Sequence, residues 1–225
     1  MKDLDIRLAL RDSLTRKYSI DRSALILDEF TVCGGQYRAD LTVVNGQLKG
    51  YEIKSDYDSL RRLGSQAIGY AKVFDTVTLV LGRKHLKQAR TIVQPWWGLV
   101  VAERDGSGRI IFVEVRRERL NRETQPVSLA QLLWRPEVLA VLRRHDLHAG
   151  LCNKPRRILW QALVSNFSRQ KLRLIVRDQL KRRMTLRAVD LRTQCDVTSP
   201  LCAMSSDSRI RPVVLRSQRY TYHPN

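Results

Sequence analysis

The stretch Arg38–Lys54, RADLTVVNGQLKGYEIK, decides the fold because it predicts two β-strands joined by a turn. Two runs of β-branched and apolar residues flank Asn45-Gly46, a pair that is typical of tight hairpin turns. The first strand carries one acid, Asp40, and the second carries the acid-x-lysine triplet Glu52-Ile53-Lys54. The sequence therefore predicts a hairpin that carries two carboxylates and an amine on neighbouring strands.

The register of this hairpin determines whether the two carboxylates meet. Because side chains alternate between the faces of a strand, a two-residue turn at Asn45-Gly46 would put Asp40 and Glu52 on opposite faces. A three-residue loop, Val44-Asn45-Gly46, with a left-handed Gly46, pairs Val43 with Gln47. It places Asp40 opposite Gly50 and diagonal to Glu52, within reach of a shared ion. We expect this second register because it also assembles an apolar layer on the other face, made of Ala39, Leu41, Val43, Tyr51 and Ile53.

The remaining patterns predict an α/β fold in which a mixed sheet is flanked by helices. The first part of the chain contains helical patterns at 3–17, 56–74 and 84–93, and strand patterns at 24–32, 37–44, 48–54, 76–81, 98–102 and 109–115. Helical patterns alone follow, at 128–144, 155–165 and 171–184. The order helix, three-strand meander, helix, strand thus precedes a purely helical region.

The charge of the chain favours a polyanionic partner. Its 225 residues contain 41 Lys and Arg against 22 Asp and Glu, a net charge of +19. No apolar run is long enough for a membrane span, and the N-terminus lacks the apolar core of a signal peptide. Four scattered cysteines without a Cys-x-x-Cys pair indicate free thiols and no zinc site. We therefore expect a cytoplasmic protein that binds nucleic acid, DNA rather than RNA, and no membrane.

Composition divides the chain into three parts. Residues 1–120 hold the α/β pattern, and residues 121–190 form a basic helical module. From 151 to 190 there are eleven Lys or Arg and two Asp, a net of +9. Lys154, Arg156 and Arg157 open one of these helices, where clustered cations and a helix N-terminus would grip phosphates. Residues 191–225 contain few periodic apolar positions and predict a loosely ordered tail.

The hairpin residues suit the chemistry of a divalent cation. Mg²⁺ is commonly held by one or two carboxylates together with waters and a substrate phosphate, and Mn²⁺ accepts similar ligands. Asp40 and Glu52 would supply the carboxylates, and the backbone carbonyl of Ile53 would add a ligand. Lys54 would orient or deprotonate the attacking water, or neutralise the charge that develops on the phosphate. The alternative is a salt-bridged hairpin without chemistry, because acid-x-lysine triplets are common by chance.

Asp40 with Glu52-Ile53-Lys54 resembles the motif of the PD-(D/E)xK nuclease superfamily, although Ala39 stands where that motif has proline. Within the superfamily, the segments RADLTVVNG, GYEIKSD, VFDTVTLV and WWG are similar to bacterial proteins of the sce7726 family. The resemblance covers about residues 1–187. It implies a restriction-endonuclease-like core with a C-terminal basic helical module.

The same resemblance assigns further site residues. Gln66 and Tyr70 match the Gln-x-x-x-Tyr motif of the exonuclease-like branch, where these residues bind the substrate end or brace the site. Glu29 on the first strand or Asp5 on the first helix would supply an additional acid. From the residues themselves, Asp56 and Asp58 are expected to cap the helix that follows the hairpin.

These patterns together predict a Mg²⁺-dependent nuclease that cuts phosphodiester bonds, in DNA processing, repair or phage defence. It would act on DNA and could form a homodimer. Two alternatives stay open: a catalytically silent nucleic-acid-binding protein with a nuclease-like core, and an RNA-cleaving toxin or effector.

Overall fold

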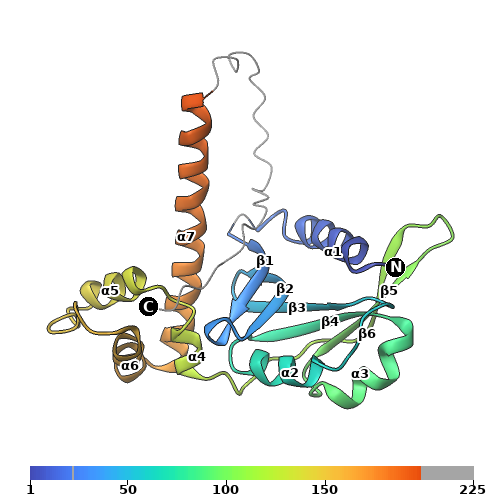
Figure 1. Cartoon of the computed structure of the whole chain (residues 1–225), viewed down its shortest axis with the longest axis horizontal. Helices are drawn as coiled ribbons and strands as arrows, with labels where there is room; N and C mark the ends of the chain where they lie inside the picture. Colours follow the sequence, from blue (N-terminus) through green and yellow to red (C-terminus); the bar gives the residue numbers. More distant parts are fainter. Residues whose placement is uncertain (22, 199–225) are drawn as a thin grey trace.

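A computed structural model of the chain describes residues 1–21 and 23–198, with side chains described up to Arg183 (Figure 1). Its centre is a mixed sheet with the strand order β1-β2-β3-β4-β5-β6. The central pairs β3–β4 and β4–β5 are parallel, and the outer pairs are antiparallel. The strands are β1 (Leu25–Val32), β2 (Tyr37–Val44), β3 (Leu48–Lys54), β4 (Thr76–Gly82), β5 (Gly98–Arg104) and β6 (Ile110–Arg116).

Helices cover both faces of this sheet (Figure 1). One face packs under α1 (Asp3–Lys17), whose Ile6, Leu10 and Leu14 follow the i, i+4 spacing and are buried. The other face packs against α2 (Leu63–Ala71) and α3 (Leu86–Ile92). Two short 3₁₀ helices, Cys33–Gly35 and Arg83–His85, complete this part of the chain. The structure thus has the α/β architecture with flanking helices that the sequence patterns predict.

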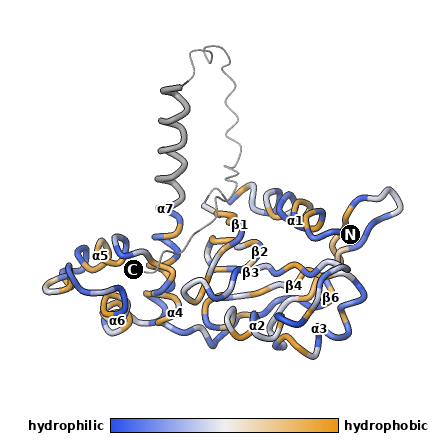
Figure 2. Tube along the Cα trace, in the orientation of Figure 1, coloured by the Kyte–Doolittle hydropathy of each residue, from blue (hydrophilic) through white to orange (hydrophobic). Residues whose placement is uncertain are grey.

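The C-terminal helices pack into the apolar cluster on the same side of the sheet as α2 and α3. They are α4 (Pro126–Ala130), α5 (Arg135–Arg144), α6 (Arg156–Asn166) and α7 (Arg169–Thr198). Their buried residues belong to the same apolar cluster as α2 and the sheet, and Figure 2 shows apolar segments in both parts. The buried Asp75 joins the two parts, since it forms ion pairs with Arg173 and Arg177 of α7. The predicted helical module therefore shares a core with the α/β part.

Two predicted segments differ from the structure. The helix expected over 56–74 begins only at Leu63, because the carboxylate of Asp58 accepts hydrogen bonds from the backbone N–H (2.7 Å) and hydroxyl (2.6 Å) of Ser55. These bonds hold a turn in place of a helix, so Asp58 does not cap α2, and Asp56 instead pairs with the N-terminal amine. At the other end, α7 continues to Thr198, beyond the predicted boundary at 190, and residues 199–225 lie outside the described residues.

In the β2–β3 hairpin, Asp40 and Glu52 lie on the same face of the sheet, as predicted, but the loop that joins the strands differs from the prediction. Val44 pairs with Leu48 and Leu41 with Tyr51, so the three loop residues are Asn45–Gln47, not Val44–Gly46. The predicted left-handed Gly46 is wrong, because among the described residues positive φ at glycine occurs at Gly34, Gly35, Gly108 and Gly150. Tertiary structure explains the shift, since the backbone N–H of Leu48 donates to Asp75 at 2.7 Å. The register thereby brings Asp40 towards Glu52 itself, rather than opposite Gly50.

The predicted apolar layer is correct except for one residue. Leu41, Val43, Tyr51 and Ile53 pack together under α1, whereas Ala39 belongs to the opposite cluster. The cause lies in β1, where Glu29 has a left-handed backbone with φ +54°. This conformation interrupts the alternation of side chains along β1. The side chains of β1 and β2 therefore turn to the opposite face of the sheet on either side of the Glu29–Asp40 position.

No helix in the described ranges is long and apolar enough to cross a membrane.

Candidate functional site

Asp40 and Glu52 lie where the β2–β3 ladder ends, one residue beyond its last pair, Leu41 with Tyr51. The strands separate here, and the side chain of Asp40 takes the place of the missing backbone partner. Its Oδ2 accepts a hydrogen bond from the backbone N–H of Ile53 at 2.7 Å. A cleft of about 350 Å³ opens at this point. Its lining includes Asp3, Arg7, Arg38, Asp40, Glu52, Ile53, Lys54, Asp58, Arg62 and Gln66.

Glu52 is the most enclosed charged group of the cleft, with 2% of its surface exposed. Its Oε1 accepts hydrogen bonds from Lys54 Nζ (2.5 Å) and Gln66 Nε2 (2.7 Å). Its Oε2 lies 2.6 Å from the hydroxyl of Tyr70. Gln66 and Tyr70 reach the same carboxylate because four residues separate them on α2, which places them on one helical face. The structure thus brings together four of the residues that the sequence singled out.

The hydroxyl of Tyr70 connects the two strands of the site. It is 2.6 Å from the backbone carbonyl of Arg38 on β2 as well as from Glu52 on β3. Burial, followed by the charge of Glu52, raises the pKa of Tyr70 well above its ordinary value, so the phenol keeps its proton. Tyr70 therefore braces the gap between the strands, and its ring packs in the core against Phe74 and Trp97.

Asp40 carries the clearest electrostatic signature in the cleft. Burial, and then the charge of Glu52, raise the pKa of Asp40 to about 7, although the nearby Arg7 opposes the shift. Two carboxylates that are held this close repel each other, and the repulsion favours either a proton or a cation between them. Perturbation of this kind is enriched at functional sites.

Arg7 is a site residue that the sequence analysis missed. It projects from α1 and donates to Asp40 Oδ1 at 2.8 Å, to Asp3 at 3.2 Å and also to Glu29. A signal was present in the sequence, because Arg7 follows the buried Ile6 on the helical stripe that faces the sheet. Glu29 lies on β1 and Asp40 on β2, so only the packing of α1 against these strands brings Arg7 to the two acids.

The two candidates for an additional acid are engaged elsewhere. Glu29 pairs with Arg7 and with Arg38, at 2.6 Å from the latter, and does not line the cleft. Asp5 accepts a hydrogen bond from the backbone N–H of Lys2 and lies 3.7 Å from Arg104. The neighbouring acid Asp3 lines the cleft instead, because it is one i, i+4 step from Arg7 on the helix.

The donor set fits a small divalent cation of the Mg²⁺ class. Asp40 and Glu52 provide two carboxylates, which is the number that Mg²⁺ typically takes from a protein. Gln66 Oε1 is buried beside Glu52 and has no hydrogen-bond partner among the described residues, so it could accept a hydrogen bond from a cation-bound water. Across the described ranges, no group of three or more His, Cys, Asp or Glu side chains is arranged as metal ligands. Asp40, Glu52 and the amide oxygen of Gln66 are therefore the groups of this cleft that could hold a cation and its waters.

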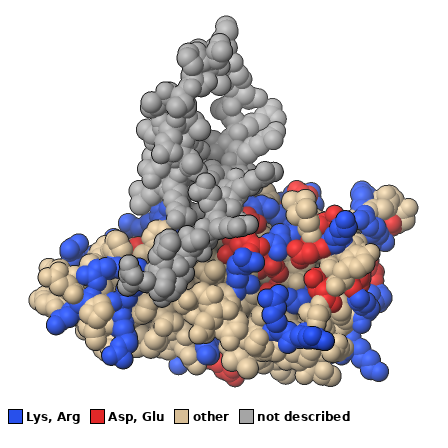
Figure 3. Space-filling view, viewed as in Figure 1, with Lys and Arg blue, Asp and Glu red and all other residues tan. Residues whose placement is uncertain are grey.

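The predicted phosphate-binding cations lie on a different surface. Lys154, Arg156 and Arg157 are exposed at the start of α6 and do not line the cleft. The loop before them is held by Arg135, which donates to the backbone carbonyls of Cys152 and Lys154. Figure 3 shows Lys and Arg side chains gathered over the end of the molecule that α5 and α6 form.

The fold and the cleft define an α/β protein with a mixed six-stranded sheet and a charged site that contains two facing carboxylates. The chain belongs to the family of bacteriophage P4 protein cII, whose family model matches residues 2–195. Protein cII of Enterobacteria phage P4 is 27% identical over 183 residues, which cover 81% of this chain and 68% of that protein. The family assignment places the chain in a phage-related context.

Two solved structures match parts of this chain with low TM-scores. A protein of unknown function from Silicibacter pomeroyi matches with a TM-score of 0.38 and 15% identity, over 66% of this chain and 91% of that one. SfsA from Pyrococcus furiosus, solved in complex with Ca²⁺, matches with a TM-score of 0.32 and 18% identity, over 51% and 64%.

Proposed function

We propose that this protein is a metal-dependent nuclease that hydrolyses phosphodiester bonds in DNA, in a phage-related setting of DNA processing, repair or defence. The observation that carries the proposal is the meeting of Asp40 and Glu52 at the end of the β2–β3 ladder, with Lys54 on Glu52. The core would be of the restriction-endonuclease type, and the motif resembles the PD-(D/E)xK superfamily and its sce7726 family. Residues 1–120 would form the nuclease core and residues 121–190 a nucleic-acid-binding module.

Asp40, Glu52 and the backbone carbonyl of Ile53 would hold the cation, Mg²⁺ or Mn²⁺. A cation bound there supplies Lewis acidity towards a phosphate oxygen and lowers the pKa of a bound water. Tyr70 and Gln66 set the position of the Glu52 carboxylate through hydrogen bonds of 2.6 and 2.7 Å. They would thus act as positioning residues, the bracing role that the sequence resemblance offers as an alternative to binding the substrate end.

Lys54 is the group best placed to act on the reacting phosphate. Its amine is nearly buried and lies 2.5 Å from Glu52. This ion pair holds the Lys54 side chain inside the cleft. From this position it would orient the attacking water or neutralise the charge that develops on the phosphate. Arg38 and Arg62 line the same cleft and would hold the neighbouring backbone phosphates. The exposed Lys154, Arg156 and Arg157 and the net charge of +19 would supply binding further along the strand.

Digestion of linear, circular, single-stranded and branched DNA and RNA with Mg²⁺ or Mn²⁺ tests the proposal. We expect cleavage of DNA by the full chain and its loss in Asp40→Ala, Glu52→Ala and Lys54→Ala, with binding retained. Asp12→Ala is the matched control, since this exposed acid pairs with Arg16 on α1, away from the cleft. Cleavage that survives all three substitutions would refute the assignment.

A second function, nucleic-acid binding without cleavage, is favoured by one observation. Protein groups already satisfy both carboxylates: Arg7 and the Ile53 N–H bind Asp40, while Lys54, Gln66 and Tyr70 surround Glu52. Such a site is self-contained without a cation. Binding of DNA with no cleavage under any metal, and with no effect of metal on thermal stability, would favour this alternative.

A further inference from the structure

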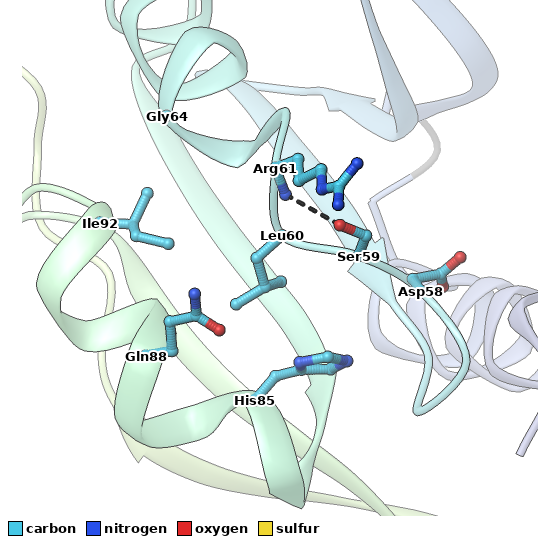
Figure 4. A pocket seen from close by; sticks show the side chains of 8 residues that line it. All are labelled: Asp58, Ser59, Leu60, Arg61, Gly64, His85, Gln88 and Ile92. Atoms are coloured by element: carbon cyan, nitrogen blue, oxygen red, sulfur yellow. Dashed lines mark hydrogen bonds between the residues drawn. The ribbon is translucent and has the colours of Figure 1, made fainter.

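A second cleft, of about 660 Å³, lies beside the candidate active site (Figure 4). It is lined by Asp58, Ser59, Leu60, Arg61, Gly64, His85, Gln88 and Ile92. The loop between β3 and α2 separates the two clefts, and Asp58 of this loop borders both. The loop is tied to the active site because Asp58 binds Ser55, the residue after Lys54. A ligand in the second cleft would therefore lie one loop away from the catalytic lysine.

One wall of this cleft is a face of the α3 segment. His85, Gln88 and Ile92 follow the i, i+3, i+7 spacing. The side chains of Gln88 and Ile92 point towards Leu60 on the opposite wall, whereas the His85 ring turns towards the loop that carries Ser55 (Figure 4). The half-buried Ile92 gives this cleft its apolar surface, whereas Leu60, only 5% exposed, lies mostly beneath it. The cleft is open beside Gly64, which has no side chain. A Cβ added at this position would come within 4 Å of Ile92 Cγ2 alone, at 3.8 Å, so a larger side chain there would project into the cleft.

The polar groups of the cleft are available to a ligand. Within the described ranges no protein group hydrogen-bonds the side-chain amide of Gln88, which offers both a donor and an acceptor. His85 Nε2 lies 3.1 Å from the carbonyl of Ser55 and must donate to it, so Nδ1 of the neutral ring stays an acceptor. Arg61 belongs to the rim and supplies a positive charge. An apolar surface, an amide edge and a nearby cation are together the groups that bind a nucleotide.

We propose that this cleft holds one unpaired nucleobase of the strand that enters the neighbouring active site. The proposal rests on the proposed function and sharpens its substrate class to single-stranded or locally opened DNA. Ile92 would contact one face of the base, and the imidazole ring of His85, which lines the same cleft, would stack on it, as aromatic rings do in other single-strand sites. Gln88 would bind the hydrogen-bonding edge, which is exposed only when the base has no partner. Arg61 would contact the adjoining phosphate.

The test is a binding measurement on the full chain in EDTA, so that no strand is cut. Fluorescence anisotropy follows a short labelled DNA single strand in which an abasic site replaces each nucleotide in turn. We expect one position at which the loss of the base weakens binding about tenfold, the size of a single stacked base. In Gln88→Ala and Gly64→Leu this abasic effect should fall below about twofold, because the base contact is already lost or blocked. Gln161→Ala, an exposed glutamine on α6, is the matched control and should keep the full effect.

The outcomes separate this inference from the nuclease assignment. A scan with no sensitive position, or variants that keep the full abasic effect, would overturn the base-binding cleft even where the protein cuts DNA. A sensitive position that disappears in both variants supports the cleft, even where no cleavage is detected. A duplex should bind without this sensitivity, and equal sensitivity in a duplex would contradict the requirement for an unpaired base.

Discussion

Replacement of Asp40 by asparagine should make the protein more stable at alkaline pH and leave its stability unchanged in acid. Burial and the charge of Glu52 raise the pKa of Asp40 from 3.8 to about 7. The folded protein therefore binds this proton more tightly than the unfolded chain does, and wild-type stability falls as pH rises from about 4 to 7. Asparagine at this position has a similar shape and cannot ionise, so the variant escapes this loss.

The magnitude follows from the size of the shift. One pKa unit corresponds to about 1.4 kcal/mol, so a shift of about three units costs the wild type about 4 kcal/mol at pH 8. Only 17% of the side chain is exposed, so solvent screening reduces this value little. The cost belongs to the Asp40–Glu52 pair, and Glu52→Gln should relieve part of it as well. The free energy of unfolding of Asp40→Asn should thus exceed that of the wild type by up to about 4 kcal/mol at pH 8 and by almost nothing at pH 4.

Urea unfolding in EDTA at both pH values measures this difference. Asp12→Asn, on the exposed side of α1, controls for the removal of an acid and should show no such pH dependence. A bound divalent cation would remove the same repulsion, so Mg²⁺ should raise the Tm of the wild type at pH 8 and not that of Asp40→Asn. An equal stability difference between variant and wild type at pH 4 and pH 8 would refute the electrostatic reasoning.

Three further predictions concern the contacts around the site. Tyr70→Phe should lower the free energy of unfolding by about 1–3 kcal/mol in urea titrations, because it leaves buried acceptors on both strands without a donor; an unchanged value would remove the bracing role. Asp75→Asn should cost about 3 kcal/mol or more, since this buried acid holds two arginines of α7 and the N–H of Leu48; no loss would mean that these ion pairs do not stabilise the fold. Joint replacement of Lys154, Arg156 and Arg157 by alanine should reduce the slope of log affinity against log salt by about 0.7 per single-strand phosphate contact removed; an unchanged slope would exclude this surface from binding.

Local sequence patterns were sufficient for several regular elements and for the two acids that meet in the site. The strand positions Tyr37–Val44 and Leu48–Lys54 and the helix Asp3–Lys17 match the structure, because runs of β-branched residues and helical apolar spacing are local properties. The face on which each side chain lies was also predictable, since a shift of the pairing by one residue would expose the apolar face of the hairpin. This alternation alone was enough to put Asp40 and Glu52 on the same face.

Contacts between segments that are distant in the sequence decided the rest. The loop at Asn45–Gln47 is followed by a hydrogen bond from the backbone N–H of Leu48 to the distant Asp75. The late start of α2 is a local exception, because Asp58 binds Ser55 only three residues away, a turn that helical periodicity does not reveal. Arg7 joins the site only because α1 packs across the strands that carry its acidic partners. The sequence by itself thus determined which residues could form strands and which acids could meet. Only the tertiary structure decided that the arginine Arg7 stands beside these acids and where a second cleft opens. Both features arise from the packing of separate elements and not from the periodicity of the sequence.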